Sequence, residues 1–247
     1  MVMKSPTAAR HRITHRIGRL YSKHIVTPCL LCGINTEQAC LCPNCSAALP
    51  RLGQSCQRCA LPITLGQYCG RCLTNPPIRH RTRSLFRYTS PVNRLIADMK
   101  YHSQLQLADY LAHQLALAVQ QQCESESKPQ LLIPIPLHPK RLRQRGYNQS
   151  VELAKTLSKH LNIPLDNNAL IRIKNTLPQT QLPYTKRKQN IKSAFQCRHA
   201  TLPEHIVLID DVLTTGHTAD MAAKVCLKQG EKKVELWTIA RSIRDYA

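Results

Sequence analysis

The chain has 247 residues, and 35 lysine and arginine residues against 14 aspartate and glutamate residues give it a formal net charge of +21. Its apolar runs are all shorter than the ~18 residues that a membrane-spanning helix needs, which excludes an integral membrane protein of the helical kind. So basic a balance indicates an anionic partner, with nucleic acid as the first candidate and an anionic membrane surface as the second.

The positive charge is densest in the first part of the chain. Residues 1–97 carry 14 lysine and arginine residues and a single acid, Glu37. Residues 1–25 form a basic arm without the apolar segment of a secretory signal. Ile13, Ile17 and Leu20 fall on one helical face of this arm, so an amphipathic helix and a solvated tail both fit the pattern.

Two cysteine sets with the same spacing follow the arm, and they predict a double zinc-ribbon module over residues 26–78. Each set reads C-x2-C-x9-C-x2-C; each close pair places two thiolates on one tight turn, and two such turns complete a tetrahedral site. Pairing within each set is favoured over a cross-braced exchange, because the segment between the pairs is long enough to fold back as a hairpin. The expected zinc ligands are Cys29, Cys32, Cys42 and Cys45 in the first set and Cys56, Cys59, Cys69 and Cys72 in the second.

All ligand positions in the module are thiolates, which predicts two structural rather than catalytic zinc ions. A disulfide framework is the alternative; the lack of a secretory signal and the further cysteines Cys123, Cys197 and Cys226 argue against it. Cys40 falls outside both spacings. The module has few large apolar residues, so zinc must supply most of its folding free energy, on the order of 10 kcal/mol per site. Two such sites lower the net charge to about +17, which is still strongly basic.

From residue 79 onward, apolar runs alternate with helical patterns. This alternation predicts an α/β domain over residues 79–247, with a mostly parallel, doubly wound sheet covered by helices on both faces. The expected elements, in chain order, are a basic bridge at 79–87, a strand at 85–88, one or two helices within 91–122, a surface linker at 124–129, a strand at 131–136, a basic loop at 138–149, a helix at 151–161, a short strand at 169–173, a strand at 207–209, a helix at 219–227 and a final strand at 235–240, in which Trp237 packs.

The strand at 207–209 ends in two adjacent acids, Asp210 and Asp211, followed by a small-residue turn and a helix. Free backbone N–H groups, threonine hydroxyls and the positive end of a helix dipole make such a turn an anion site. Carboxylates repel a phosphate, so the acids suit what lies beside it in a sugar phosphate: vicinal ribose hydroxyls or a bridging magnesium ion. A strand-turn-helix whose acids merely cap the helix is the alternative.

Residues 207–218 resemble the phosphoribosyl-pyrophosphate loop of type I phosphoribosyltransferases. The resemblance implies that Asp210 and Asp211 hold the ribose hydroxyls and that magnesium accompanies the phosphoribosyl pyrophosphate. It also implies a cradle for the 5′-phosphate, made by Thr214, Thr215, Gly216, His217 and Thr218.

Ligands of parallel α/β sheets bind at the carboxyl ends of the strands, so three loops should meet there: residues 138–148, 174–190 and 210–218. The first two loops are basic and would face the phosphate cradle. A solvated basic rim is the alternative for any one of these charges. The residues that we expect to contact DNA or a diphosphate are Lys140, Arg141, Arg143, Arg145, Tyr147 and Arg187.

Nearly the whole chain after Pro28 resembles the ComF family of late-competence DNA-uptake proteins, which includes GntX-like members. The resemblance rests on the cysteine pairs, the run at 133–136, the segment from Arg141 to Gln149, several polar residues between Asn175 and Asn190, and the phosphate loop. It implies a cytoplasmic protein, free or peripheral at the inner membrane, that handles incoming single-stranded DNA. Its partners would be other uptake proteins, such as a helicase or an inner-membrane channel.

Three functions fit these observations. The leading one is a DNA-handling protein of the transformation machinery whose phosphoribosyltransferase-like domain binds phosphoribosyl pyrophosphate or a phosphate of DNA. The second is an active phosphoribosyltransferase with an unknown acceptor, although neither a familiar diphosphate loop nor a hydrophobic hood for a purine is evident. The third is a zinc-ribbon adaptor whose basic charge meets the inner membrane or a protein partner.

Overall fold

A computed structural model describes residues 26–37, 40–101, 104–122, 127–174, 194–230 and 233–243. The basic arm, Cys123 and most of the loop at 174–190, Arg187 included, lie outside these described residues. The chain divides into two compact units, residues 1–48 and residues 49–247. The second cysteine set therefore belongs to the same unit as the sheet, while the domain boundaries expected after residues 25 and 78 stay predictions.

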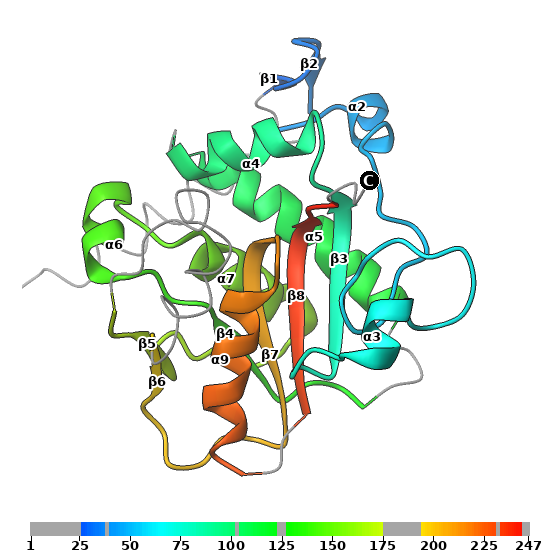
Figure 1. The fold of residues 1–247 in the computed structure, drawn as a ribbon. Helices are drawn as coiled ribbons and strands as arrows, with labels where there is room; N and C mark the ends of the chain where they lie inside the picture. The colour runs from blue at the N-terminus through cyan, green and yellow to red at the C-terminus, as the bar shows by residue number, and fades with distance from the viewer. Residues whose placement is uncertain are drawn as a thin grey trace, which may run out of the picture. The chain divides into compact units, whose positions relative to one another are not determined.

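The described residues of the first unit contain the first cysteine set and the short elements β1, β2 and α2 (Figure 1). Strand β1 (Thr27–Pro28) pairs antiparallel with β2 (Asn35–Thr36), and helix α2 spans Pro43–Ala47. Pro43 at the first helical turn favours the start of α2, because its missing N–H would have no helical acceptor there. The hairpin and the helix each deliver one cysteine pair.

The second unit is built on a four-stranded parallel sheet of order β3-β8-β7-β4 (Figure 1). Its strands are β3 (Arg81–Arg87), β4 (Leu131–Pro134), β7 (His205–Leu213) and β8 (Lys233–Arg241). In this register Ile133 lies beside Leu208, and Ile209 beside Trp237. The central strands β7 and β8 are buried over almost their whole length, as expected when helices cover both faces. The prediction of a mostly parallel α/β sheet is confirmed.

Helices cover both faces of this sheet. Figure 1 shows α9 (His217–Leu227) in front of it and α5 (Leu105–Gln122) and α7 (Gln149–Leu161) behind it. α7 packs on α5, β4 and β7, and α9 packs on β7 and β8. The buried face of α9 consists of Ala219, Ala222, Ala223 and Cys226, small residues that let the helix approach the strands closely. The second unit also contains the helices α4 (Val92–Tyr101) and α3 (Gly70–Thr74).

Two parts of the second unit differ from the sequence-based expectation. The prediction of a basic loop at 138–149 is wrong, because Pro139–Arg145 form helix α6. His138 Nδ1 accepts the N–H of Lys140 at 3.2 Å to cap it, and Gly146, at φ +82°, ends it. The short strand β5 (Leu170–Arg172) pairs antiparallel with β6 (Phe195–Cys197) in a separate ribbon, since an antiparallel return needs no crossover helix.

A buried polar cluster joins β3, β7 and β8 in the core. Glu235 accepts hydrogen bonds from Trp237 Nε1 at 3.0 Å and Arg83 Nε at 3.4 Å, and its other oxygen lies 3.2 Å from His205 Nε2. Burial raises the pKa of Glu235, but the hydrogen bonds from His205 and Trp237 and the charge of Arg83 outweigh it and lower that pKa to about 2. Trp237 is fully buried in the sheet, as expected.

Candidate functional site

The acidic pair lies near the carboxyl end of β7, and two helices bring it partners. Lys100 Nζ, from the last turn of α4, forms an ion pair with Asp211 Oδ2 at 2.9 Å. Ser150 Oγ, from the first turn of α7, donates to Asp210 Oδ1 at 3.1 Å, and the N–H of Asp211 donates to the same oxygen at 2.9 Å. The two carboxylates are thus held in place by α4, α7 and their own strand.

The surroundings of the pair make Asp210 a weak acid. Burial is the largest cause and the charge of Asp211 the next, and together they raise the pKa of Asp210 to about 7 against the opposing effects of its hydrogen bonds and of Lys100. Burial alone would lower the pKa of Lys100, but the charge and hydrogen bond of Asp211 raise it. The ammonium group therefore stays charged, while Asp210 changes protonation near neutral pH.

A tight loop, residues 214–216, connects β7 to α9. Gly216 is the N-cap of α9 and has φ +85°, a conformation that side chains other than that of glycine rarely adopt. A β-carbon at this position would lie 3.2 Å from Arg79 Nη1, so a side chain here would also crowd the Arg79 guanidinium. The loop and Asp210 line a hollow of about 30 Å³, roughly the volume of one water molecule. The first turn of α9 directs its N–H groups to this end, as an anion site requires.

Helix α6 carries a second group of charges and leads directly into α7, the helix that carries Ser150. Arg145 donates to Gln149 Oε1 at 2.8 Å, and its guanidinium lies 5.3 Å from the centre of the Tyr101 ring. Burial and the charge of Arg145 lower the pKa of Arg141. Such mutual repulsion among like charges is relieved by an anion.

Tyr147 lies in the turn between α6 and α7, and Gln149 is the first residue of α7. Within the described parts of the chain, the Tyr147 hydroxyl and the Gln149 Nε2 are buried without a hydrogen-bond partner. Burial raises the pKa of Tyr147. The ring of Tyr147 is only partly accessible, whereas Tyr101 is 70% exposed. Tyr101 is therefore the more accessible of the two rings for stacking.

The structure adds three residues to those expected at the site: Lys100, Ser150 and Arg172. Lys100 is one of many lysines in the sequence and carries no motif, so only the packing of α4 reveals it. Ser150 directly follows the Asn148-Gln149 pair that the family resemblance singles out, which was a usable signal. Arg172 on β5 is close enough for the charge of Asp210 to raise its pKa, although burial and Arg141 lower it overall.

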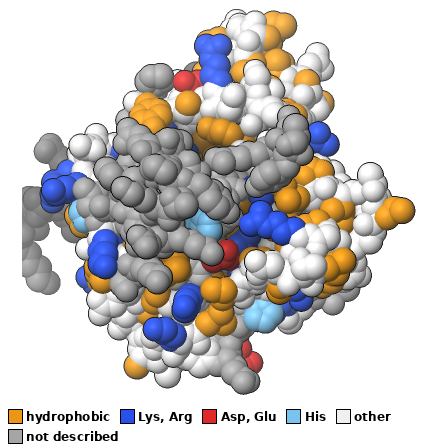
Figure 2. Space-filling model, viewed as in Figure 1, with side chains coloured by type: hydrophobic (Ala, Val, Ile, Leu, Met, Phe, Trp, Pro, Cys, Tyr) orange, Lys and Arg blue, Asp and Glu red, His pale blue; other side chains and the backbone are white. Residues whose placement is uncertain are grey.

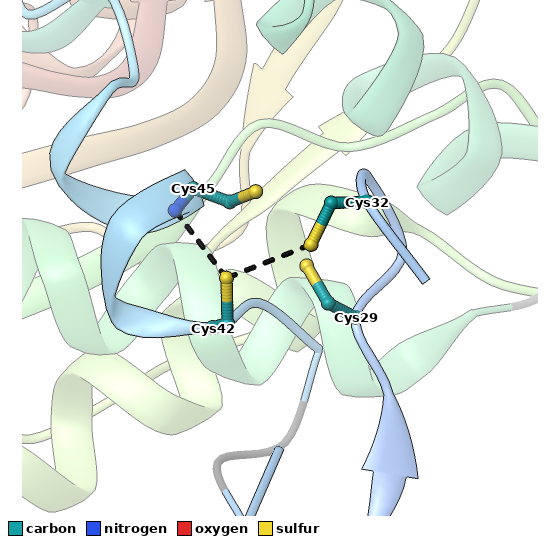
Figure 3. Close-up of side chains that lie close together, drawn as sticks. All are labelled: Cys29, Cys32, Cys42 and Cys45. Atoms are coloured by element: carbon teal, nitrogen blue, oxygen red, sulfur yellow. Dashed lines mark hydrogen bonds between the residues drawn. The ribbon is translucent and has the colours of Figure 1, made fainter. Parts of the chain in front are cut away.

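The first cysteine set converges on one point (Figure 3). The four Sγ atoms lie within 4.8 Å of one another, with Cys32 Sγ 3.7 Å from Cys42 Sγ. A zinc ion with Zn–S bonds of about 2.3 Å separates its sulfur ligands by about 3.8 Å, so the set fits a tetrahedral zinc site. Burial raises the pKa of Cys29, but the N–H groups of Cys42 and Cys32 outweigh it and lower that pKa to about 6, which favours a thiolate.

The second set has the same geometry within the second unit. Its four Sγ atoms also lie within 4.8 Å of one another, and Cys59 Sγ lies 3.6 Å from Cys69 Sγ. The sulfurs are too far apart for disulfides, whose S–S bonds are about 2.05 Å long. Each cluster consists of four cysteines that are consecutive in the expected sets, as pairing within each set predicts and a cross-braced exchange does not. Both clusters can hold a structural zinc ion. Cys40 belongs to neither cluster.

A basic groove of about 600 Å³ lies beside β3, away from the acidic pair. It runs between residues 51–57, the edge of β3 and helix α5. Arg51, Arg81 and Arg83 line it, together with glutamine and serine side chains. Figure 2 shows lysine and arginine side chains spread over several areas of one face, where acidic side chains are few. In the described parts of the chain, no helix has the length and apolar character needed to cross a membrane.

Comparison with known sequences identifies relatives that share most of the chain, although no protein-family model matches it. DNA utilization protein YhgH of Shigella flexneri is 33% identical over 206 residues, which cover 82% of this chain and 91% of that protein. Competence protein F of Haemophilus influenzae is 32% identical over 208 residues, 82% of this chain and 90% of that protein. Competence protein ComFC of Bacillus subtilis is 25% identical and again matches 82% of this chain, with 84% of its own length.

Two solved structures match part of the chain. A glutamine phosphoribosylpyrophosphate amidotransferase from B. subtilis, complexed with ADP and GMP, is 17% identical with a TM-score of 0.35, over 53% of this chain and 25% of that one. A purine phosphoribosyltransferase from Pyrococcus horikoshii is 17% identical with a TM-score of 0.34, over 54% of this chain and 81% of that one.

Proposed function

Because the chain belongs to the ComF family, with competence protein F and DNA utilization protein YhgH among its relatives, we propose that it handles single-stranded DNA in the cytoplasm during DNA uptake. In this proposal Asp210, Asp211 and residues 214–218 bind phosphoribosyl pyrophosphate with magnesium. Lys140, Arg141, Arg143 and Arg145 contact the DNA or the diphosphate. Other uptake proteins, such as a helicase or an inner-membrane channel, would be its partners.

The main observation in support of this ligand is that the acidic pair lies beside the loop. Two successive carboxylates, one bound to Ser150 and the other to Lys100, suit the paired hydroxyls of a ribose, since each carboxylate oxygen accepts a hydrogen bond. The adjoining N-terminus of α9 suits the phosphate on the same sugar. A ligand that carries both groups a few ångströms apart would engage the carboxylates and the helix N-terminus together, whereas a phosphate alone would engage only the helix N-terminus.

The DNA part of the proposal is supported by charge and by family membership. Helix α6 and the groove lined by Arg51 and Arg81 present two basic surfaces within the second unit, whereas the charge of Arg83 in the same groove is paired with Glu235. Basic surfaces bind nucleic acid through its phosphates without reading sequence. We therefore expect binding that depends strongly on salt and weakly on base sequence.

Isothermal calorimetry tests the ligand directly. The full-length protein would be titrated with phosphoribosyl pyrophosphate and magnesium, with ribose 5-phosphate, and with inorganic phosphate. We expect phosphoribosyl pyrophosphate to bind at least tenfold more tightly than inorganic phosphate, because phosphate lacks the hydroxyls that the acids accept. No binding of phosphoribosyl pyrophosphate at millimolar concentration, or equal affinity for inorganic phosphate, would contradict the proposed site.

A second function, active phosphoribosyl transfer, is favoured by the pKa of Asp210. A carboxyl group that exchanges its proton near pH 7 beside the proposed ribose has the property of a general acid or base. Diphosphate release, measured with magnesium and a panel of nitrogenous bases, decides between the two functions. Release that depends on an added base supports catalysis, and binding without release supports a ligand-binding role.

A further inference from the structure

The second cysteine set is joined to the sheet through the backbone of its own first turn. This turn contains Cys56 and Cys59, two of the four expected metal ligands. The carbonyl oxygen of Arg58, inside the turn, accepts a hydrogen bond from Thr82 Oγ1 of β3 at 2.7 Å. The carbonyl oxygen of Cys59 accepts one from Arg241 Nε of β8 at 2.9 Å.

Arg241 continues from this turn to the candidate phosphate loop. Its side chain is 7% exposed at the end of β8. Its Nη1 donates to the carbonyl oxygen of Leu213 at 3.0 Å and also to that of Thr214, where β7 passes into the loop. One planar guanidinium thus holds the metal-ligand turn and the start of the loop at the same time.

Arg79 makes a second connection from the turn to the far end of the loop. It is 3% exposed, and its Nε donates to Thr82 Oγ1 at 2.7 Å, the same hydroxyl that donates to the turn. Its Nη1 forms an ion pair with Asp220 in the first turn of α9. The same atom packs behind Gly216. Arg79 therefore fixes the N-terminus of α9 with respect to the cysteine turn.

A pocket of about 210 Å³ lies between the cysteine set and the loop, lined among others by Cys59, Arg71, Thr215 and His217. The cysteine set and the loop are therefore separated by this pocket, and the side chains of Arg79 and Arg241, which also line it, connect them. The apolar cluster of the cysteine set is small: Leu61 and Ile63 pack on three buried cysteines. Without a metal ion, so small a cluster gives the turn little to hold its shape.

We propose that Arg241 and Arg79 are positioning residues that make the geometry of residues 213–220 depend on metal binding at the second cysteine set. The proposal rests on the proposed function only in taking this loop as the phosphate site. Because linkage is reciprocal, a ligand that needs the ordered loop should in turn slow the loss of the metal from this set. The cysteine set is then part of the ligand site and not a separate fold-stabilising module.

Hydrogen–deuterium exchange of the full-length protein tests the connection without any ligand. Cys59→Ser removes a metal ligand but keeps the backbone carbonyl that Arg241 binds. Arg241→Lys keeps the charge but loses the planar set of donors. Thr82→Val keeps the shape and removes the hydroxyl that joins Arg58 to Arg79. We expect amide exchange in residues 213–220 to become at least tenfold faster in each variant, while exchange in the central part of α5 changes little.

Three controls keep the test specific. Arg94→Lys makes the same substitution at an exposed arginine of α4 and should leave loop exchange unchanged. Cys32→Ser removes metal from the first set while leaving the turn at Cys56 and Cys59 intact. Zinc content, measured by elemental analysis, should fall in Cys59→Ser and stay at two equivalents in Arg241→Lys. Unchanged loop exchange in a Cys59→Ser protein that has lost one zinc equivalent would overturn the proposal.

Two further measurements distinguish a loss of folding from a loss of ligand binding. A change in Trp237 fluorescence would show that Arg241→Lys has lost its fold. In that case Thr82→Val provides the test. Unchanged amide exchange of residues 213–220 in Thr82→Val would overturn the connection through Arg79. In wild-type protein, phosphoribosyl pyrophosphate with magnesium should slow zinc release to a chelator, and Arg241→Lys should lose this effect while retaining its zinc. Altered exchange in a protein that binds no phosphoribosyl pyrophosphate would support the connection and refute the proposed function.

Discussion

Lys100 and Asp211 form an ion pair of 2.9 Å that joins the end of α4 to the end of β7, and only 20% and 12% of their side chains are exposed. Lys155 and Glu152 form a pair of the same length on the surface of α7, where the Lys155 side chain is 55% exposed. Because the two ion pairs have the same N–O distance but differ in burial, comparing them measures how burial changes the contribution of an ion pair to stability. Water screens the second pair, while the first is largely shielded.

We predict that Lys100→Met lowers the free energy of unfolding by about 1–3 kcal/mol, because it leaves the shielded carboxylate of Asp211 without its cation. Lys155→Met should cost at most about 0.5 kcal/mol. Urea unfolding of both variants, followed through Trp237 fluorescence, measures the difference. Equal effects of the two substitutions would show that the position of Lys100 at the site has no particular role in stability.

We predict that the double variant Asp210→Asn, Asp211→Asn binds phosphoribosyl pyrophosphate at least tenfold more weakly, a loss of about 1.4 kcal/mol. Asparagine keeps the size of each side chain and removes the negative charge, so the fold should survive. Calorimetry in the presence of magnesium gives the affinity, and circular dichroism confirms the fold. Wild-type affinity in a folded double variant would reject the acidic pair as part of the site.

The raised pKa of Asp210 predicts a pH-dependent affinity. The groups that face Asp210 are Asp211 on its own strand, Lys100 on α4, Ser150 on α7 and Arg172 on β5. Below pH 7 Asp210 is protonated in the free protein, and a ligand whose hydroxyls need both carboxylates must displace that proton. Affinity for phosphoribosyl pyrophosphate should therefore rise with pH, by up to about tenfold per unit below the pKa, and level off above pH 7.

Asp210→Asn supplies the control for this pH dependence, since the ligand's own phosphates also titrate. The difference between the two pH profiles isolates the protein's carboxyl group. Parallel profiles would contradict the assignment. The same pKa has a consequence for the free protein: it lies above the unfolded value, so the stability that Asp210 contributes is present below about pH 4 and is lost as the pH rises through 7.

The sheet and the ligand loop could be predicted from sequence because their signals are local. The apolar run of β7, the two acids and the glycine of the turn follow one another in the chain, and the structure places them together at the end of one strand. The cysteine clusters were predictable for the same reason, since their spacing alone brings four thiolates to one point.

The parts that were missed depend on contacts between distant segments. Arg79 and Asp220 are far apart in the chain, and so are Arg241 and Cys59, and nothing in either local pattern indicates that they meet. Helix α6 was missed for another reason. Its charges suggested a solvated loop, while the signals that mattered were Pro139 at its start and Gly146 at its end.

The core carboxylate Glu235 predicts an acid-sensitive fold. Its pKa is about 2 in the folded protein against an ordinary value of 4.5, so its contribution to stability is full above about pH 5 and is lost as the pH falls toward 2. The loss should be on the order of 3 kcal/mol. Unfolding experiments across this range should show a steeper decline in wild type than in Glu235→Gln, which has no charge to lose. Parallel declines would place the acid sensitivity elsewhere.

The last prediction concerns DNA and separates charge from stacking. Changing Lys140, Arg141, Arg143 and Arg145 to alanine should weaken binding and flatten the salt dependence by one to three phosphate contacts. Each contact contributes a log–log slope of about −0.7 on a single strand, so titrations between about 50 and 200 mM salt resolve the change. An unchanged slope would exclude α6 from the DNA contact.

Preference for single strands needs exposed rings on which unpaired bases stack, at about 1–3 kcal/mol per base. Tyr101 is the stronger candidate, because its ring is 70% exposed and lies beside Arg145, whereas the Tyr147 hydroxyl is buried. Tyr101→Leu should leave the salt slope unchanged and reduce the preference for single strands over duplex at physiological salt, and Tyr147→Leu should do so to a smaller extent. Fluorescence anisotropy with matched single-stranded and duplex oligonucleotides measures both quantities. If wild-type protein binds duplex as tightly as single strands, stacking plays no part, and the basic surface acts through charge alone.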